Sequence, residues 1–350
     1  MLKQHQLLPL FKKFISGTKN GKRLNKNGTR IKPQTIENYC NCLRLLQELE
    51  TAVQKELIVY EIKGNNKREH IMLKKYWSNF YKQFTNYLYK QKDCHDNYTG
   101  HNIKTIRTFF NWLNNNAGIF TGPYYKNFYI TKEEVDIVTL SVEQLQFFVF
   151  DNAFENNLSK PLLRCKDIFV FGCMVGLRFS DLCNLTQRNI ESRDGYIYLK
   201  VRSQKTVTDT LVKLPAQAVE IINKYKNNKS KLLPMVSLVR FNKNLKRLAE
   251  LAGWVYPISK TRNKRGLNKG KSNTTFRFCD IMSSHIMRRT CITTMLTSGM
   301  PEYIVRKISG HTSDSKSFFR YVSLAQSFMD KEIDKMHSHF ELQKKVMDTL

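Results

Sequence analysis

Residues 176–182 read Gly-Leu-Arg-Phe-Ser-Asp-Leu, and they overlap the end of the longest apolar run of the chain, residues 168–177. That run spans about ten residues, whereas a membrane span needs roughly 20, so it indicates a buried core helix. The residues after it form a turn that places Arg178 just before a second helix. The stretch therefore predicts a helical core with an arginine at its edge.

Four further segments of the same half of the chain place polar side chains at informative positions. Lys205 lies in Ser-Gln-Lys-Thr, at a turn between two strands. His285 and Arg288 lie three residues apart and therefore on one helix face. His311 follows Gly310 in a glycine turn, and Tyr321 comes ten residues later.

Each of these residues, taken alone, has an ordinary structural interpretation. A lone arginine beside Asp181 is more often a salt bridge at a helix end, and a lone turn lysine is usually solvated. Tyr321 stands beside two phenylalanines and on its own would be a core aromatic. Tyr303 is a rival nucleophile on composition alone, and its neighbours Ile304 and Ile308 predict that it is buried in the core.

Periodicity predicts a fold that is mostly α-helical with a small β-sheet, an α+β fold. Residues 1–125 show helical spacing in three stretches, which begin near Pro33, His70 and Asn102. A linker covers residues 126–140. Residues 141–335 are mixed, and residues 336–350 form a C-terminal tail. In the mixed part, helices are expected at 142–153 and 162–175, strands at 196–202 and 208–214, and a basic loop at 260–271.

The charge of the chain points to a polyanionic partner. Lys and Arg number 58 against 29 Asp and Glu, a net charge of +29 over 350 residues. Such an excess attracts nucleic acid first and an anionic membrane second, and the lack of a long apolar run disfavours the membrane. The eight cysteines form no CxxC pair, so free thiols and a cytoplasmic location are expected.

Nearly half of this excess lies at the start of the chain. Residues 1–130 hold 22 Lys and Arg against 8 Asp and Glu, a net +14. One loop-like segment carries six of these cations, which we expect to contact DNA phosphates although each alone could be merely solvated. They are Lys19, Lys22, Arg23, Lys26, Arg30 and Lys32.

The order Arg178, Lys205, HxxR, Gly-His and Tyr321 resembles the tyrosine recombinase family, the phage integrases and mobile-element integrases. The resemblance covers roughly residues 5 to 335 and extends to the flanking residues, including HxxRRT and SGHTS. Two departures stand out. Asp181 replaces the glutamate of many members, and the gap before Tyr321 is about one residue longer than usual.

The resemblance implies an all-helical core-DNA-binding N-domain and a mixed α/β catalytic C-domain. Many mobile-element integrases carry a further DNA-binding domain ahead of the helical one, which we do not expect here. It also implies duplex DNA with specific recombination sites as the partner, a homotetramer on that DNA linked through the C-terminal tails, and accessory DNA-bending proteins. We expect no cofactor, no metal and no ATP, and a cytoplasmic, nucleoid-associated protein.

The same resemblance implies a role for each motif residue. Arg178 and Arg288 would clamp the non-bridging phosphate oxygens with planar forks, a task that lysine performs less well. Tyr321 would attack and form a 3′-phosphotyrosine, Lys205 would protonate the leaving 5′-oxygen, and His285 would assist proton transfer. His311 would hydrogen-bond the phosphate.

Two alternatives remain open from the sequence. A type IB topoisomerase-like enzyme shares the arginine, lysine and tyrosine chemistry but only nicks and closes DNA, and strand exchange between two sites separates the two. A non-catalytic DNA-binding regulator of the same fold would form no covalent DNA adduct.

Overall fold

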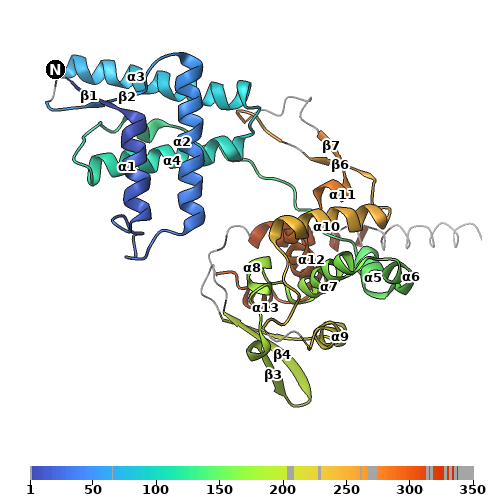
Figure 1. Ribbon diagram of the computed structural model, residues 1–350. Coiled ribbons are helices and arrows are strands. Elements are labelled where there is room, and N and C mark those ends of the chain that lie inside the picture. Colours follow the sequence, from blue (N-terminus) through green and yellow to red (C-terminus); the bar gives the residue numbers. More distant parts are fainter. Residues whose placement is uncertain are drawn as a thin grey trace, which may run out of the picture. The chain divides into compact units, whose positions relative to one another are not determined.

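The computed structural model describes residues 2–64, 66–202, 209–227, 230–260, 262–266, 274–312, 315, 318–326, 329–330, 333–334 and 337. The chain divides into two compact units (Figure 1). Unit 1 consists of Met1–Val135 and Thr261–Thr274, and unit 2 consists of Asp136–Lys260 and Thr275–Leu350. Lys205 and the residues around it, 203–208, lie outside the described residues, as does most of the tail after residue 335.

Unit 1 is a helical unit with one short sheet. Its helices are α1 (Leu7–Lys19), α2 (Pro33–Val53), α3 (Lys67–Asn86) and α4 (Asp96–Asn115), with a π-helical turn η1 (Tyr87–Gln91) and a 3-10 turn η2 (Tyr124–Asn127). Helices α1 and α2 lie side by side, and α4 packs against both (Figure 1). The apolar faces of these helices meet in an aromatic core in which Trp77 of α3 lies 4.7 Å from Phe110 of α4, between ring centroids.

Two elements of unit 1 differ from the sequence-based expectation. Helix α1 was not expected, and it includes Lys19, which was placed in a loop. Strands β1 (Lys3–Gln6) and β2 (Ile58–Glu61) pair antiparallel, with Lys3 opposite Glu61. Four-residue strands with a partner more than 50 residues away leave little local pattern in the sequence.

Two buried carboxylates bind the segment 262–266 within unit 1. Asp96, which is 2% exposed, accepts from the backbone nitrogens of Arg265 (2.7 Å) and Gly266 (2.8 Å). Glu133 accepts from the Arg262 side chain at 3.1 Å and from the backbone nitrogen of Asn263. These bonds explain why the basic loop, expected with the second domain, belongs to unit 1.

Unit 2 is built around one buried helix, α7 (Lys160–Val175), as the apolar run predicted. It contacts α5 (Val142–Phe150), α9 (Ala216–Lys224), α10 (Leu238–Leu251) and α12 (Ser284–Thr297). At Gly172 the approach of α12 is so close that a Cβ atom would lie 2.4 Å from the sulfur of Met287. Further helices of unit 2 are α6 (Asn152–Asn156), α8 (Phe179–Leu182), α11 (Phe278–Ile281) and α13 (Glu302–Ser309), and residues 318–326 are also helical.

The main sheet of unit 2 has the antiparallel order β3-β4-β5. Strands β4 (Tyr196–Arg202) and β5 (Asp209–Lys213) confirm the two expected strands, whereas β3 (Ile190–Arg193) was not predicted. Strands β6 (Pro257–Lys260) and β7 (Thr274–Arg277) form a second, two-stranded sheet, and a 3-10 turn, η3 (Gln187–Asn189), precedes β3. Within the described ranges, no helix has both the length and the apolar character needed to cross a membrane.

Candidate active site

Five of the six residues singled out for catalysis line one cavity of unit 2, of about 380 Å³. The sixth, Lys205, lies outside the described residues. The cavity is lined by Ile137, Arg178, His285, Arg288, Arg289, His311, Thr312, Ser315, Arg320 and Tyr321. Segments more than 140 residues apart in the chain therefore meet at one site.

Arg178 is positioned by the turn between α7 and α8. Gly176 ends α7 with a left-handed backbone, φ +67°, a conformation that glycine adopts without steric cost. A Cβ at this position would also lie 3.1 Å from the sulfur of Cys291 on α12. Arg178 then occupies the N-cap of α8 in an extended conformation, in the expected turn before a helix.

Arg288 lies at the back of the cavity and is only 2% exposed. One terminal nitrogen of its guanidinium donates to the Gly176 carbonyl at 2.8 Å, and the other lies 3.1 Å from Nε2 of His311. Burial, followed by repulsion from Arg178, lowers the pKa of Arg288 to about 10. The guanidinium therefore remains a cation at neutral pH, fixed in place before any ligand arrives.

The hydrogen bonds around His311 define its tautomer. Ser309 Oγ donates to the Val305 carbonyl at 2.6 Å, so toward His311 Nδ1, 2.8 Å away, it can only accept. The same Arg288 nitrogen lies 3.2 Å from Nδ1 and 3.1 Å from Nε2, and we assign the proton to Nδ1, which faces Ser309, so that Nε2 accepts from Arg288. Burial, followed by repulsion from Arg288 and Arg178, lowers the pKa of His311 to about 3, so the ring is neutral. In this state His311 orients Arg288, and it would need a proton on Nε2 to donate to a phosphate.

Tyr321 is held by the small apolar cluster beside the cavity. It is 5% exposed and packs with Phe318, Ile292 and Val305. Its ring centroid lies 6.0 Å from that of His311. Tyr321 therefore packs in an apolar cluster, as its neighbours in the sequence indicated, and its side chain also lines the cavity.

His285 lies on α12 one turn before Arg288, as the i, i+3 spacing predicted. Its side chain is exposed, in contrast to that of Arg288. It lines both this cavity and a neighbouring hollow. The position allows it to meet solvent and a bound ligand at the same time.

The prediction that Tyr303 is a core residue is wrong. Its side chain is 72% exposed on α13, and it is not among the residues that line the cavity. Helix α13 buries Val305 and Ser309, so a residue two positions before Val305 points away from the core. Although Tyr303 is exposed, it is not the better candidate for the nucleophile, because the arginines of the cavity lie around Tyr321.

Sequence reasoning missed two arginines of the cavity, Arg289 and Arg320. Arg289 follows Arg288 directly and lies four residues after His285, a spacing that shares the same helix face. Arg320 directly precedes Tyr321. The doubled arginine in HxxRR was the available signal.

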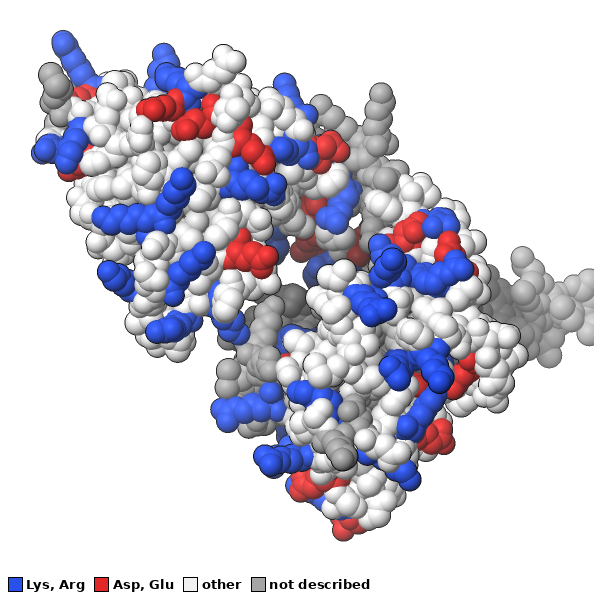
Figure 2. Space-filling model, in the orientation of Figure 1, with Lys and Arg blue, Asp and Glu red and all other residues white. Residues whose placement is uncertain are grey.

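The six cations predicted to bind DNA lie around the end of α1 and the loop after it. Five of them have exposed side chains, whereas Arg23 is partly buried. Its guanidinium lies 4.2 Å from the Phe14 ring centroid and donates to Thr18 at 2.9 Å. Basic side chains are spread widely over the face of the molecule seen in Figure 2, with fewer acidic ones among them.

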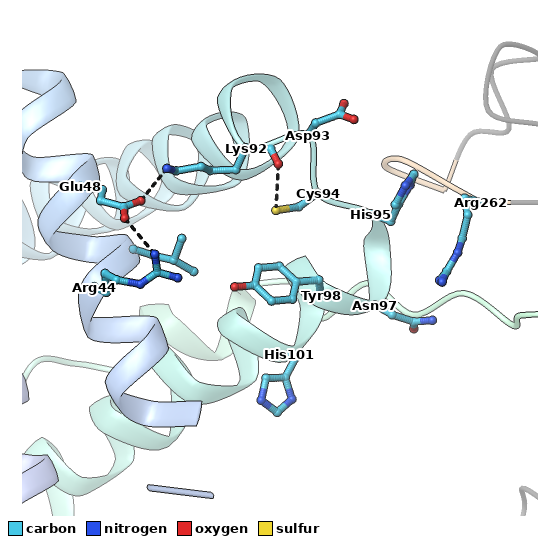
Figure 3. Close-up of a pocket in the computed structure, with 11 residues that line it drawn as sticks. Arg44, Glu48, Lys92, Asp93, Cys94, His95, Asn97, Tyr98, His101 and Arg262 are labelled. Carbon is cyan, nitrogen blue, oxygen red and sulfur yellow. Dashed lines mark hydrogen bonds and ion pairs between the residues drawn. The ribbon is translucent and has the colours of Figure 1, made fainter. Parts of the chain in front are cut away.

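A second cavity, of about 720 Å³, lies within unit 1 between α2, α4 and the turn before α4 (Figure 3). Its cations are largely paired, since Glu48 binds Lys92 at 2.8 Å and Arg44 at 3.4 Å (Figure 3). Lys264 pairs with Asp93 on its rim. Because acids offset its cations, this cavity lacks the concentrated positive charge of the cavity around Tyr321.

Comparison with solved structures shows the same fold in DNA recombination proteins. A lambda integrase dimer bound to a COC′ core site matches with a TM-score of 0.61 and 13% identity, over 91% of this chain and 77% of the other. The XerH site-specific recombinase in a post-cleavage complex with palindromic difH matches with a TM-score of 0.58 and 12% identity, over 93% and 95%. The Tn1549 transposon integrase with circular intermediate DNA matches with a TM-score of 0.57 and 16% identity, over 90% and 94%.

A search of curated proteins found no match to the sequence. The model of the phage integrase family, in contrast, matches residues 152–327, which is half of the chain and includes every residue of the candidate active site except Ile137. The chain therefore belongs to the phage integrase family, the tyrosine recombinases.

Proposed function

We propose that the protein is a site-specific DNA recombinase that cleaves and rejoins duplex DNA through a 3′-phosphotyrosine at Tyr321. The observation that carries this proposal is the gathering of Arg178, Arg288, His311 and Tyr321 around one cavity in a chain of this family. A tyrosine beside several cations is suited to attack a phosphodiester, because the cations stabilise the charge that develops on the phosphate.

The proposed reaction exchanges one phosphate ester for another. The phenolic oxygen of Tyr321 forms a bond to phosphorus, the bond from phosphorus to the 5′-oxygen breaks, and the phenolic proton leaves with assistance from His285. The 5′-oxygen receives a proton, for which Lys205 is the candidate donor. Because the phosphotyrosine retains the ester linkage, attack by a 5′-hydroxyl on it rejoins DNA without ATP.

The arginines have the role of electrostatic stabilisation. Arg178 and Arg288 face the same cavity from two different elements, and their planar forks suit the non-bridging oxygens of one phosphate. His311 holds the guanidinium of Arg288 before DNA binds. Preorganised donors of this kind typically contribute on the order of 10²–10³ in rate each.

The proposed substrate is duplex DNA with specific sites, bound by an oligomer. The solved relatives include a lambda integrase tetramer bound to a Holliday junction, with a TM-score of 0.59. We propose a homotetramer on two DNA sites, with unit 1 as a DNA-binding domain whose exposed cations near Lys19–Lys32 contact phosphates. Accessory DNA-bending proteins complete this assembly.

Covalent capture tests the proposal. The purified chain is incubated with a pool of nicked duplexes whose arms are randomised, so that a short cleaved fragment diffuses away and traps the adduct. Complexes that survive denaturation are sequenced, and the enriched sequence then serves as a fixed probe. We expect the wild type to form the adduct and Tyr321→Phe to bind the same DNA without forming it.

Tyr303→Phe is the matched control, since it removes an exposed phenol outside the cavity. An adduct in Tyr321→Phe, or its loss in Tyr303→Phe, would contradict the assignment. Adduct formation without strand exchange between two enriched sites would indicate a nicking and closing enzyme. DNA binding without any adduct would indicate a regulator.

A further inference from the structure

We propose that Arg306 positions the Tyr321 nucleophile by holding the aromatic ring of Phe318 in place. The inference rests on the proposed function and adds a residue to the machinery of that site. Arg306 does not line the cavity around Tyr321, so it acts through its neighbours and is a positioning residue.

Phe318 packs against both of the rings that the proposed reaction uses. Its ring centroid lies 5.2 Å from that of His311, in an edge-to-face arrangement, and 6.1 Å from that of Tyr321. The centroids of His311 and Tyr321 are 6.0 Å apart, so the three rings form a triangle with nearly equal sides. Phe318 and Tyr321 belong to one helical stretch, residues 318–326. A shift of the Phe318 ring would therefore move the nucleophile relative to His311.

The side chain of Arg306, on α13, lies over the Phe318 ring. Its guanidinium carbon is 4.0 Å from the ring centroid of Phe318 and 5.0 Å from that of Phe319. A cation over the face of an aromatic ring is attracted to it, and the attraction is stronger where water is excluded. The Arg306 side chain is only 13% exposed and Phe318 is fully buried, so most of the water is excluded from this contact.

Arg306 also binds the backbone of the Gly-His turn. The backbone nitrogen of His311 donates to the Arg306 carbonyl at 2.9 Å, and a terminal nitrogen of the guanidinium lies 3.5 Å from the carbonyl oxygen of Thr312. Arg306 therefore contacts the chain at both ends of the connection from His311 to Phe318. Through these contacts it fixes the position of one ring relative to the other. Reaction rates depend strongly on such geometry, since a displacement of about 1 Å can cost about 100-fold.

The ordinary structural interpretation of Arg306 is an ion pair with Glu302, 3.4 Å away and one turn earlier on α13. The Glu302 side chain is 44% exposed, and an exposed pair of this kind contributes little because water and salt screen it. Glu302→Gln tests that interpretation directly. Lys307→Met is the matched control for charge, because Lys307 is the next residue of the same helix and is exposed.

The experiment measures single-turnover adduct formation on the fixed nicked probe, with DNA affinity and urea unfolding measured in parallel. It compares the wild type with Arg306→Met, Arg306→Lys, Phe318→Leu and the double variant Arg306→Met/Phe318→Leu. Methionine keeps an apolar stem without the charge, and lysine restores a cation. We expect Arg306→Met to be about 5- to 30-fold slower with DNA affinity unchanged, the rate equivalent of one cation–π contact shielded from water. Arg306→Lys should recover part of this loss.

The double variant shows whether Arg306 acts through the Phe318 ring. Phe318→Leu should also be slow, and adding Arg306→Met to it should cause little further loss, because the contact is already absent. Losses that multiply in the double variant overturn the inference. If Phe318→Leu proves to be unfolded, the comparison of Arg306→Lys with Arg306→Met decides, and equal rates for these two variants overturn the inference.

The controls separate positioning from charge and from DNA binding. Glu302→Gln and Lys307→Met should react at the wild-type rate, and a loss in either as large as that of Arg306→Met overturns the inference. So does a wild-type rate in Arg306→Met, or a loss of DNA affinity that matches its loss of rate, which would assign Arg306 to DNA. All of these outcomes leave the proposed function standing. A wild-type protein that forms no Tyr321-dependent adduct overturns the proposed function and the inference together.

Discussion

Replacing His311 by glutamine should make the stability of unit 2 less sensitive to acid. Folding lowers the pKa of His311 from 6.5 to about 3, through burial first and then the neighbouring arginines. Between these two values the unfolded chain binds a proton that the folded chain excludes. The free energy of unfolding therefore falls as the pH falls from about 6.5 toward 3, and it is recovered as the pH rises. Glutamine does not titrate, and its amide oxygen can accept from Arg288 in place of Nε2.

The size of the effect follows from the depression of the pKa. Each pKa unit corresponds to about 1.4 kcal/mol, so the full depression would remove about 2.5 kcal/mol of stability between pH 7 and pH 4.5. The ring lines an open cavity, where solvent screens part of the interaction. We therefore expect the wild type to lose about 1–2 kcal/mol more than His311→Gln over this interval. Carboxylates that titrate in the same range contribute equally to both proteins.

Urea unfolding at pH 7 and pH 4.5, followed by tryptophan fluorescence, measures this difference. Trp254 lies in the core of unit 2, 4.5 Å from the Phe148 ring, whereas Trp77 and Trp112 belong to unit 1. Trp254→Phe in both backgrounds identifies the transition that reports on unit 2. An equal loss of stability in both proteins would refute a neutral, buried His311.

Three further predictions address the tautomer, the packing and the charge. Ser309→Ala removes the acceptor of the His311 Nδ1 proton, so adduct formation should slow about 10-fold with DNA affinity unchanged. An unaltered single-turnover rate would show that Ser309 does not determine the tautomer of His311. Gly100→Ala would place a Cβ 1.9 Å from the backbone oxygen of Thr131, so it should destabilise unit 1 by about 3 kcal/mol in urea unfolding. The control Gly17→Ala, whose Cβ would have no atom within 4 Å, should stabilise unit 1 by about 0.5–1 kcal/mol. Lys19→Gln combined with Lys22→Gln should lower affinity for all duplexes and flatten the slope of log K against log salt by about 0.9 for each lost contact; a loss confined to one sequence would mean that these lysines read bases.

The helices that the sequence predicted are those with long, regular apolar faces. Helices α2, α3 and α4 each repeat apolar residues every three or four positions over about 20 residues. Helix α1 was missed because Pro9 and Gly17 resemble breaks. Pro9 in fact lies in the first turn, where backbone N–H groups have no helical partner, and Gly17 lies in the last. Helix α1 ends at Lys19, so this residue is helical and does not belong to the loop that follows.

Strands β4 and β5 were predictable from their own alternation, whereas β3, whose partner β4 follows directly, holds a single apolar residue and was missed. Strands β4 and β5 follow each other closely in the sequence, and the alternation of each strand is visible there. The pairing of β1 with β2 depends on residues more than 50 positions apart, and so does the binding of residues 262–266 by Asp96 and Glu133. An acidic side chain in a sequence does not reveal which distant backbone donors will surround it.

The candidate site was predictable from residue types in a fixed order, but its internal contacts were not. The order of Arg178, HxxR, Gly-His and Tyr321 identified four elements that the fold brings to one cavity. The acceptor role of Ser309 toward His311 depends on side-chain directions within α13. Those directions follow from packing, so the sequence alone could not assign them.

The two sets of cations are suited to different tasks because their surroundings differ. An exposed lysine such as Lys19 interacts with phosphate through water and salt, so its contribution is general and weakens as ionic strength rises. Arg288 is buried and donates hydrogen bonds to a carbonyl and a neutral imidazole, while Asp181 offsets only part of its charge. An anionic phosphate that reaches such a cation meets a lower dielectric and a fixed donor, and the attraction grows further as the transition state gains charge. The exposed cations therefore favour capture of DNA, and the buried arginine favours the reaction of one phosphate within it.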